Sequence, residues 1–187
     1  MGAVCEVEAV KLFVGMLAGD PARFAEAETL LVERHGPVDA SSAVLPFEYT
    51  DYYRAEMGGG LLRKFLSFER LIRPDELVDI KRTTNEIEED FARRPAGGPA
   101  RPVNLDPGYL ALSKVVLATT KDYSHRVYLG KGIYAEVTLH FREGRYEPWE
   151  WTYPDYRTEE YGKFFLEVRK CLREALHTRR ETPKEEC

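Results

Sequence analysis

A glycine-rich turn between two alternating runs sets the architecture expected of this chain. The runs are His125–Leu129 and Ile133–Phe141, joined by Gly130-Lys131-Gly132, a composition typical of a β-hairpin. In the second run Ile133, Ala135, Val137, Leu139 and Phe141 occupy one face, and Tyr134, Glu136, Thr138 and His140 occupy the other. This period of two predicts antiparallel strands with one apolar and one polar face.

The residues after the hairpin extend this prediction. A turn at 142–145 leads to a third run in which Trp149, Trp151 and Tyr153 share a face, so we expect a three-stranded meander. A helix should follow from Thr158, because its apolar residues recur at helical spacing: Tyr161, Phe164, Phe165, Val168, Leu172 and Leu176. Residues 178–187 lose this period and are expected to form a disordered tail.

The first half of the chain alternates strands with helices. The apolar run 10–17 predicts a buried strand, and Asp20-Pro21 after it predicts the start of a helix that ends at His35. Strands are expected at 41–50 and 61–71. A second helix begins at Pro74, with a core-facing stripe made of Leu77, Ile80, Thr84, Ile87 and Phe91.

Residues typical of loops and turns follow this helix. Residues 93–102 (RRPAGGPARP) are rich in Gly and Pro and predict a flexible loop. The stretch NLDPGY at 104–109 has the composition of a turn, which places Asp106 in that turn. A further strand is expected at 113–121.

Composition narrows the class of protein. The 187 residues carry a net charge of -5 and 43% hydrophobic residues, which suits one α+β domain with a mixed, largely antiparallel sheet and about three helices packed on it. The lack of a basic excess argues against a nucleic-acid partner, and the lack of a long apolar run argues against secretion and membrane insertion. Three cysteines without CxxC spacing favour the reduced cytoplasm.

Several longer motifs occur in a fixed order along the chain: YYRAEMG, IKRTTNEIE, NLDPGYL, LATTKDYSHRVYLGKGIYAEVTL and WTYPDY. Through them the chain resembles the bacterial domain of unknown function 4416 family, from Val10 to about Leu172. The resemblance implies no established activity. Some members of the family are labelled GTP-binding proteins, but neither a P-loop nor an Asn-Lys-x-Asp motif occurs in this sequence.

Cationic side chains gather around the hairpin. Lys121, His125, Arg126 and Lys131 fall within a short stretch, where they can hold a phosphate or carboxylate at one end of the sheet. The alternative is that they form ion pairs with neighbouring acids such as Glu136.

Three carboxylates are the second component of this hypothesis. Asp106, Glu136 and Asp155 would bind Mg²⁺ through oxygen ligands if the fold brought them together. Otherwise Asp106 is a turn residue, Asp155 is a residue at the entry to the last helix, and Glu136 pairs with a basic residue on a neighbouring strand. His125 and Glu136 are the candidate acid/base groups, since imidazole titrates near neutral pH.

Other residues complete the candidate site. Lys81, Asn85 and Glu88 share a flank of the second predicted helix, which either faces solvent or faces a site. Aromatic residues can stack on a base or sugar, or simply pack. The ligand-binding set is Lys81, Asn104, Asp106, Tyr109, Lys121, His125, Arg126, Tyr128, Tyr134, Glu136 and Asp155.

Two hypotheses of function follow. The first is a site for a small anionic ligand, such as a nucleotide or phosphate ester, with Mg²⁺ as the candidate cofactor and turnover left open. The second is a protein–protein interaction module without catalytic activity, because Trp, Tyr and Arg are common interface anchors. A protein partner or a homo-oligomer belongs to this second hypothesis.

Overall fold

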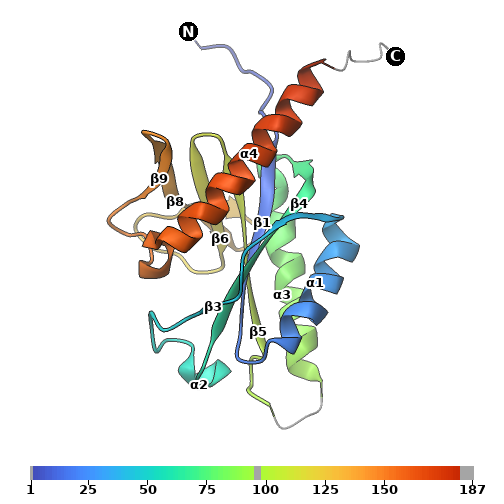
Figure 1. The fold of residues 1–187 in the computed structure, drawn as a ribbon, viewed down its shortest axis with the longest axis vertical. Helices are drawn as coiled ribbons and strands as arrows, with labels where there is room; N and C mark the ends of the chain where they lie inside the picture. The colour runs from blue at the N-terminus through green and yellow to red at the C-terminus, as the bar shows by residue number, and fades with distance from the viewer. Residues whose placement is uncertain (1, 95–97, 182–187) are drawn as a thin grey trace.

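The computed structural model describes residues 2–94 and 98–181. In this part of the chain, nine strands form one sheet and four α-helices lie around it (Figure 1). The strands are β1 (Val10–Ala18), β2 (Val38–Ser41), β3 (Leu45–Pro46), β4 (Leu62–Ile72), β5 (Val103–Ala111), β6 (Lys114–Thr119), β7 (Val127–Gly130), β8 (Ile133–Arg142) and β9 (Arg145–Pro148). The helices are α1 (Ala22–His35), α2 (Arg54–Met57), α3 (Leu77–Arg93) and α4 (Glu159–Glu181).

All strand pairs in this sheet are antiparallel, in the order β2-β4-β1-β5-β6-β8-β7. Strand β3 pairs with β4, and β9 pairs with β8. Strand β1 is buried along its length because it lies between two strands and under helices on both faces. The predicted α+β class with a largely antiparallel sheet is confirmed.

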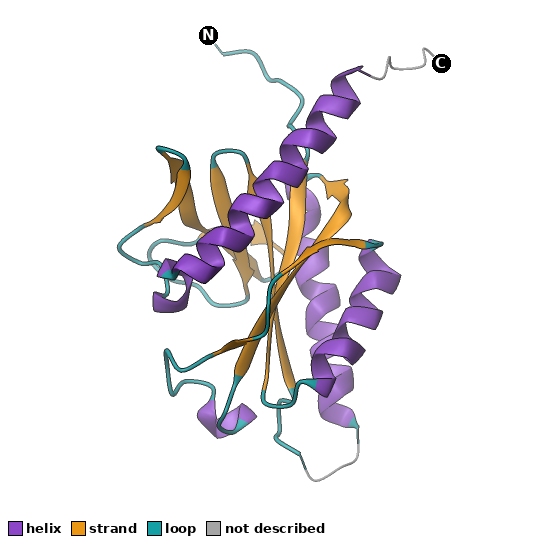
Figure 2. Cartoon of the chain, viewed as in Figure 1, coloured by secondary structure: helices purple, strands orange, loops and turns teal. Residues whose placement is uncertain are grey.

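The helices cover the two faces of the sheet unequally (Figure 2). Helices α1 and α3 pack on one face, where Phe24, Leu31 and Phe91 meet alternate residues of β1. Helix α4 crosses the other face, where Phe164 and Phe165 meet Phe13 of β1. We call these the α1/α3 face and the α4 face. None of the helices in the described residues has the length and apolarity needed to cross a bilayer.

The predicted stripe of the second helix is confirmed, since Leu77, Ile80, Thr84, Ile87 and Phe91 of α3 are all buried. The prediction for 41–50 is wrong in detail, because two short strands, β2 and β3, stand at 38–41 and 45–46. Helix α4 continues to Glu181, so residues 178–181 of the predicted tail are helical. Residues 182–187, and 95–97 of the predicted loop, lie outside the described residues.

The predicted turn at NLDPGY is wrong, because these residues lie inside strand β5. Gly108 is needed there for its small size, since a Cβ atom would lie 2.5 Å from the Phe13 ring. Pro107 is tolerated because its nitrogen, like that of Leu105, faces away from β1, and the pairing of β5 with β6 begins only at Gly108. No partner strand therefore misses its N–H.

The C-terminal hairpins pair as predicted, β7 with β8 and β8 with β9. Strand β6 pairs with one edge of β8. Strands β7 and β9 both pair with the other edge, β7 at the start of β8 and β9 at its end. Strand β9 ends at Pro148, and the two tryptophans lie in the turn after it. The expectation that Trp149, Trp151 and Tyr153 share a strand face is therefore wrong.

Candidate functional site

Polar side chains collect on the α4 face. Asp106 of β5 is the register partner of Gly15 on β1, and Glu136 of β8 is the partner of Leu117 on β6. Their sequence neighbours Leu105 and Ala135 pack on the opposite face. Since successive side chains of a strand alternate between faces, both carboxylates point to the α4 face.

The first group is the Asp106 cluster, defined as Arg63, Arg101, Asn104, Asp106 and Asp155. Arg63 of β4 donates from Nη1 to Asp106 Oδ2 at 3.1 Å, and its Nη2 lies 3.5 Å from Asp155 Oδ2. Asn104 Nδ2 donates to Asp106 Oδ2 at 2.7 Å, and Arg101 donates to Asn104 Oδ1. One buried guanidinium thus holds two carboxylates.

The two carboxylates of this cluster differ in acidity. Burial raises the pKa of Asp106, but the charges of Arg63, Lys81 and Arg101 outweigh it, and the net pKa is lowered. For Asp155, burial outweighs the attraction of Arg63 and the pKa is raised. Asp106 therefore stays ionised, whereas Asp155 holds its proton more readily.

Lys81 and Glu88 face inward from α3, so the expectation of a solvated flank is wrong for these two residues. Lys81 Nζ donates to the Leu105 carbonyl at 2.8 Å, and the Leu105 N–H donates to Glu88 Oε1 at 2.7 Å. Leu105 lies beyond the segment of β5 that pairs with β6, so these side chains satisfy backbone groups that lack a strand partner. Glu88 also accepts from Arg101 at 2.7 Å.

The second group is the Glu136 cluster, defined as Lys121, His125, Arg126, Glu136 and Tyr153. The buried Glu136 Oε2 accepts from Arg126 Nε at 2.8 Å and lies 3.1 Å from His125 Nε2. Arg126 also donates to the Lys121 carbonyl at 2.9 Å and to Tyr153 Oη at 2.7 Å. Each of the three guanidinium nitrogens thus donates to a neighbour, so Arg126 positions these groups.

A ladder of rings borders the Glu136 cluster. We define the aromatic stack as Tyr123, His125, Trp151, Trp149 and His140. The ring centres of His125 and Trp151 lie 5.5 Å apart, with 14° between the ring planes. The ring centres of Trp151 and Trp149 lie 5.4 Å apart, with 10° between the planes. The ring centres of Trp149 and His140 lie 4.3 Å apart, and those of Tyr123 and His125 lie 5.3 Å apart.

The stack is fixed in place yet partly open to solvent. Trp151 Nε1 donates to the Val137 carbonyl at 3.0 Å, which anchors its ring to β8. Trp149 and Trp151 remain 38% and 39% exposed, and Tyr123 is 65% exposed. Each tryptophan lies between two other rings, so Tyr123 at the end of the stack is the exposed ring on which another flat group can stack.

Tyr153 connects the two clusters. Its hydroxyl accepts from Arg126. Burial is the main cause of its raised pKa; the charge of Arg126 opposes this, and the carboxylates of Glu136 and Asp106 both add to it. Tyr153 of the Glu136 cluster stands two residues before Asp155 of the Asp106 cluster, so the chain itself places the two clusters near each other.

The predicted site residues divide between these groups. The Asp106 cluster contains Asn104, Asp106 and Asp155, and the Glu136 cluster contains Lys121, His125, Arg126 and Glu136. Tyr109 packs on the α1/α3 face, away from both clusters. Tyr128 and Tyr134 pack on each other in the hairpin, with their ring centres 5.1 Å apart. Within the described residues no group of three or more His, Cys, Asp or Glu could hold a metal ion.

Sequence reasoning does not select Arg63, Arg101 or Tyr153 as site residues. A signal for Arg63 exists, because it stands between Leu61 and Phe65 at alternate positions of a strand, where an apolar residue is expected. Arg101 lies in the Gly/Pro-rich segment that predicts a flexible loop. It is anchored instead by Glu88 and Asn104.

Comparison with known proteins supplies the family but no activity. A family model described as a domain of unknown function (DUF4416) matches residues 8–171. Neither the curated proteins nor the solved structures gave a significant match. Because the family model spans most of the sequence, including both clusters and the aromatic stack, the chain belongs to the DUF4416 family.

Proposed function

We propose that the protein binds a small anionic ligand with a flat ring, a nucleotide or similar phosphate ester, beside the Glu136 cluster in the cytoplasm. The observation that carries this proposal is the position of the His125 ring. Glu136 lies 3.1 Å from its Nε2, and the ring lies nearly parallel to Trp151, at 14°. The oriented imidazole supplies a polar edge, and Tyr123, which ends the stack beside it and is 65% exposed, supplies a ring on which a flat group can stack.

The aromatic stack would take the flat part of the ligand. Trp149 and Trp151 each lie between two other rings, so the ring left open to the ligand is Tyr123, which ends the stack and is 65% exposed. A base that stacks on an aromatic ring gains about 1–3 kcal/mol, whichever of the bases it is. This favours a nucleotide over a phosphate ester without a ring.

Lys121 and His125 are the groups available to the anion. Lys121 is exposed; its Nζ donates one of its three hydrogens to Tyr52 Oη and lies 4.2 Å from the centre of the Tyr52 ring. The side chain of Arg126 is only 7% exposed, and each of its three nitrogens already donates to a neighbour. Arg126 therefore orients Glu136 and Tyr153, and Lys121 carries the charge that meets the ligand.

The Asp106 cluster would contact the polar part of the ligand. The side chain of Asp106 is 26% exposed although Arg63 beside it is buried, and its lowered pKa keeps it ionised. An ionised carboxylate accepts hydrogen bonds from the hydroxyl groups of a sugar. Such contacts would make the site prefer nucleotides over free bases.

Tryptophan fluorescence tests this proposal directly, because both tryptophans of the chain lie in the aromatic stack. Titration with AMP, ATP and GTP, each with and without Mg²⁺, should quench the fluorescence in a saturable way. Adenosine and pyrophosphate should each bind more weakly, since each lacks half of the ligand. No saturable change with any nucleotide would overturn the proposal.

Two lysine variants separate this site from general electrostatic attraction. Lys121→Met should weaken nucleotide binding about tenfold, the loss expected for one charged contact. Lys131→Met is the matched control, because Lys131 lies in the neighbouring hairpin but pairs with Asp79 of α3 at 2.7 Å. Equal effects of the two changes would contradict a site at Lys121.

The interaction module is retained as a second candidate because of strand β7. This strand ends the sheet, and its Val127, Tyr128 and Leu129 are 67%, 58% and 42% exposed. An apolar edge strand can pair with the same strand of a second copy. Analytical ultracentrifugation at increasing protein concentration should then show a dimer, and the Val127→Lys variant should stay monomeric. A wild-type protein that is monomeric at every concentration would reject this pairing.

A further inference from the structure

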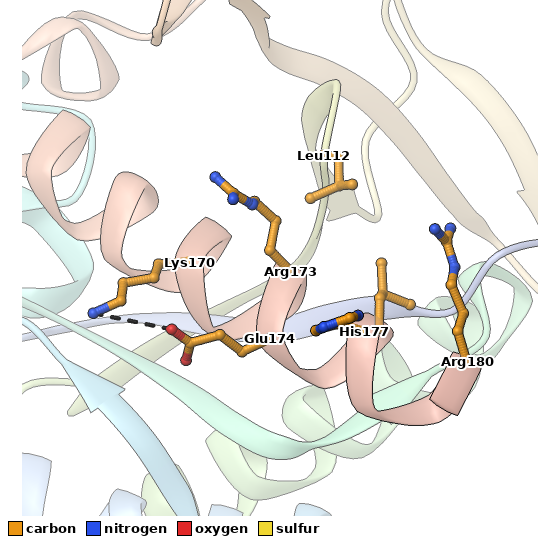
Figure 3. A pocket seen from close by; sticks show the side chains of 7 residues that line it. Leu112, Lys170, Arg173, Glu174, His177 and Arg180 are labelled. Atoms are coloured by element: carbon orange, nitrogen blue, oxygen red, sulfur yellow. Dashed lines mark ion pairs between the residues drawn. The ribbon is translucent and has the colours of Figure 1, made fainter. Parts of the chain in front are cut away.

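A groove lies at the opposite end of α4 from the candidate site. It has a volume of about 580 Å³ and is lined by Leu112, Lys170, Arg173, Glu174, Leu176, His177 and Arg180. Figure 3 shows these side chains leaving the last turns of α4, with Leu112 of the β5–β6 turn beside them. None of these residues belongs to either cluster, so this groove is a separate feature.

The groove is basic although the whole chain is acidic. Lys170, Arg173, His177 and Arg180 follow one another at steps of three and four, which places them on one side of the helix. Glu174 is the one acidic residue among the lining residues, against a net charge of -5 for the chain. A local excess of cations on an acidic protein is a specific feature of this surface.

The cations are only weakly neutralised by their neighbours. Lys170 lies 4.0 Å from Glu174 with both side chains exposed, and such pairs hold little energy. His177 lies 3.3 Å from Glu181 and Arg180 pairs with Glu8 at 2.7 Å, again between exposed side chains. Among the residues that the structure describes, Arg173 has no carboxylate within ion-pair distance. Arg173 is thus the cation most available to a partner.

The floor of the groove is apolar and held in place. Leu176 is 8% exposed and belongs to the core under α4, and Leu112 packs against the same core. Arg169 donates to the Leu112 carbonyl at 3.0 Å, and its guanidinium lies 3.7 Å from the centre of the Phe141 ring. The β5–β6 turn is therefore fixed to α4, and the groove is preformed.

We propose that this groove docks an acidic segment of a partner protein that places an apolar side chain on Leu112 and Leu176. Carboxylates of the segment would meet Lys170, Arg173 and Arg180 at the rim. An apolar floor under a basic rim matches a peptide in which acidic and apolar residues alternate. A continuous phosphate backbone fits less well, because Glu174 interrupts the row of cations and the floor offers it no hydrogen bond.

Fluorescence anisotropy with a labelled peptide tests this proposal on the whole chain. The probe is fluorescein-labelled (Glu-Glu-Leu)4, with (Glu-Glu-Ser)4 as the peptide that keeps the charge and loses the apolar side chains. The leucine peptide should bind and the serine peptide should bind at least about tenfold more weakly. Absence of binding by the leucine peptide, or equal binding of the two, would overturn the proposal.

Two charge reversals on the same helix locate the site. Arg173→Glu should weaken binding of the leucine peptide by about tenfold or more, whereas Arg179→Glu should leave it unchanged. Arg179 is exposed further along α4 but does not line the groove, so both variants change the net charge equally. Equal loss in both would indicate nonspecific attraction and overturn the proposal. Preferential binding of a labelled oligothymidylate that depends on Arg173 would replace the peptide with a nucleic acid and overturn it as well.

Discussion

Arg63 of β4 reaches Asp106 of β5 at 3.1 Å although strand β1 lies between them. The residue of β1 beneath this ion pair is Gly15, which is the register partner of both Phe65 and Asp106. A Cβ atom at Gly15 would lie 3.0 Å from Arg63 Nη1 and 2.8 Å from the Phe65 ring. The missing side chain is what lets two strands that are not neighbours exchange a charge-assisted hydrogen bond.

Gly15→Ala is therefore expected to destabilise the protein by about 1–3 kcal/mol, the usual cost of overpacking a core. The cost arises because the Phe65 ring is buried under α4 and cannot move freely. Urea denaturation measures the change. Gly162→Ala in α4, where nothing lies within 4 Å of the added Cβ, is the control and should not destabilise. Equal behaviour of the two variants would contradict the steric explanation.

Asp106→Asn should lower the free energy of unfolding by about 2 kcal/mol at pH 7, the value of a hydrogen bond to a charged group. The neutral amide of this variant would leave Arg63 with Asp155 as its remaining carboxylate, at 3.5 Å. Since the pKa of Asp106 is lowered on folding from 3.8, its contribution is present above that pH and is lost as the pH falls through the folded value. The free energies of unfolding of the two proteins should thus converge below pH 3.8, and a constant gap would refute this assignment.

His35 provides a second pH-dependent contribution, on the α1/α3 face. Burial, then Arg70 and Arg34, lower its pKa from 6.5 to about 4, with Glu76 opposing them. Because the unfolded chain binds the proton first as the pH falls, the free energy of unfolding should drop between pH 6.5 and pH 4. After allowance for solvent screening we expect about 2 kcal/mol.

His35→Gln removes this titration and keeps a polar side chain of similar size. The variant should lose less stability than the wild-type protein between pH 7 and pH 4, as measured by urea denaturation at several pH values. Parallel pH profiles of the two proteins would show that His35 does not contribute.

Lys81→Met should destabilise the protein by about 2 kcal/mol, because it leaves the buried Leu105 carbonyl without its donor and Glu88 with Arg101 as its remaining cation. Hydrogen exchange at the Leu105 amide, which donates to Glu88, should become faster as well. Lys163→Met, at an exposed pair with Glu159 of α4, serves as the comparison and should leave stability unchanged. Unaltered exchange at Leu105 would argue against the role given to Lys81.

Local periodicity predicts the elements that depend on their own residues. The stripe from Leu77 to Phe91, the stripe from Tyr161 to Leu176 and the β7–β8 hairpin all follow from spacing within one element. The strand character of Asp106-Pro107-Gly108 could not be read this way. It depends on Phe13 of β1 and on the point where β6 starts to pair, both distant in sequence.

The candidate site is predictable in part for the same reason. The contact of Glu136 with His125 and Arg126 joins residues ten and eleven positions apart across a hairpin, so their proximity follows from the local pattern. Arg63 lies 43 positions before Asp106, and only the strand order brings the two together. Lys81 and Glu88 turn inward because the β6 side of Leu105 has no strand to pair with, which no helical pattern reveals.

The short pairing of β5 with β6 gives the sheet a forked shape. Only Gly108–Ala111 of β5 pair with Lys114–Leu117 of β6, and beyond this segment the two strands diverge as two prongs. Asp106 lies on the prong that contains β5, and Glu136, the partner of Leu117, lies near the base of the prong that contains β6 and β8. Phe164 and Phe165 of α4 pack against residues of both prongs. Because α4 packs against both prongs, this helix braces the fork and holds the two prongs at a fixed separation.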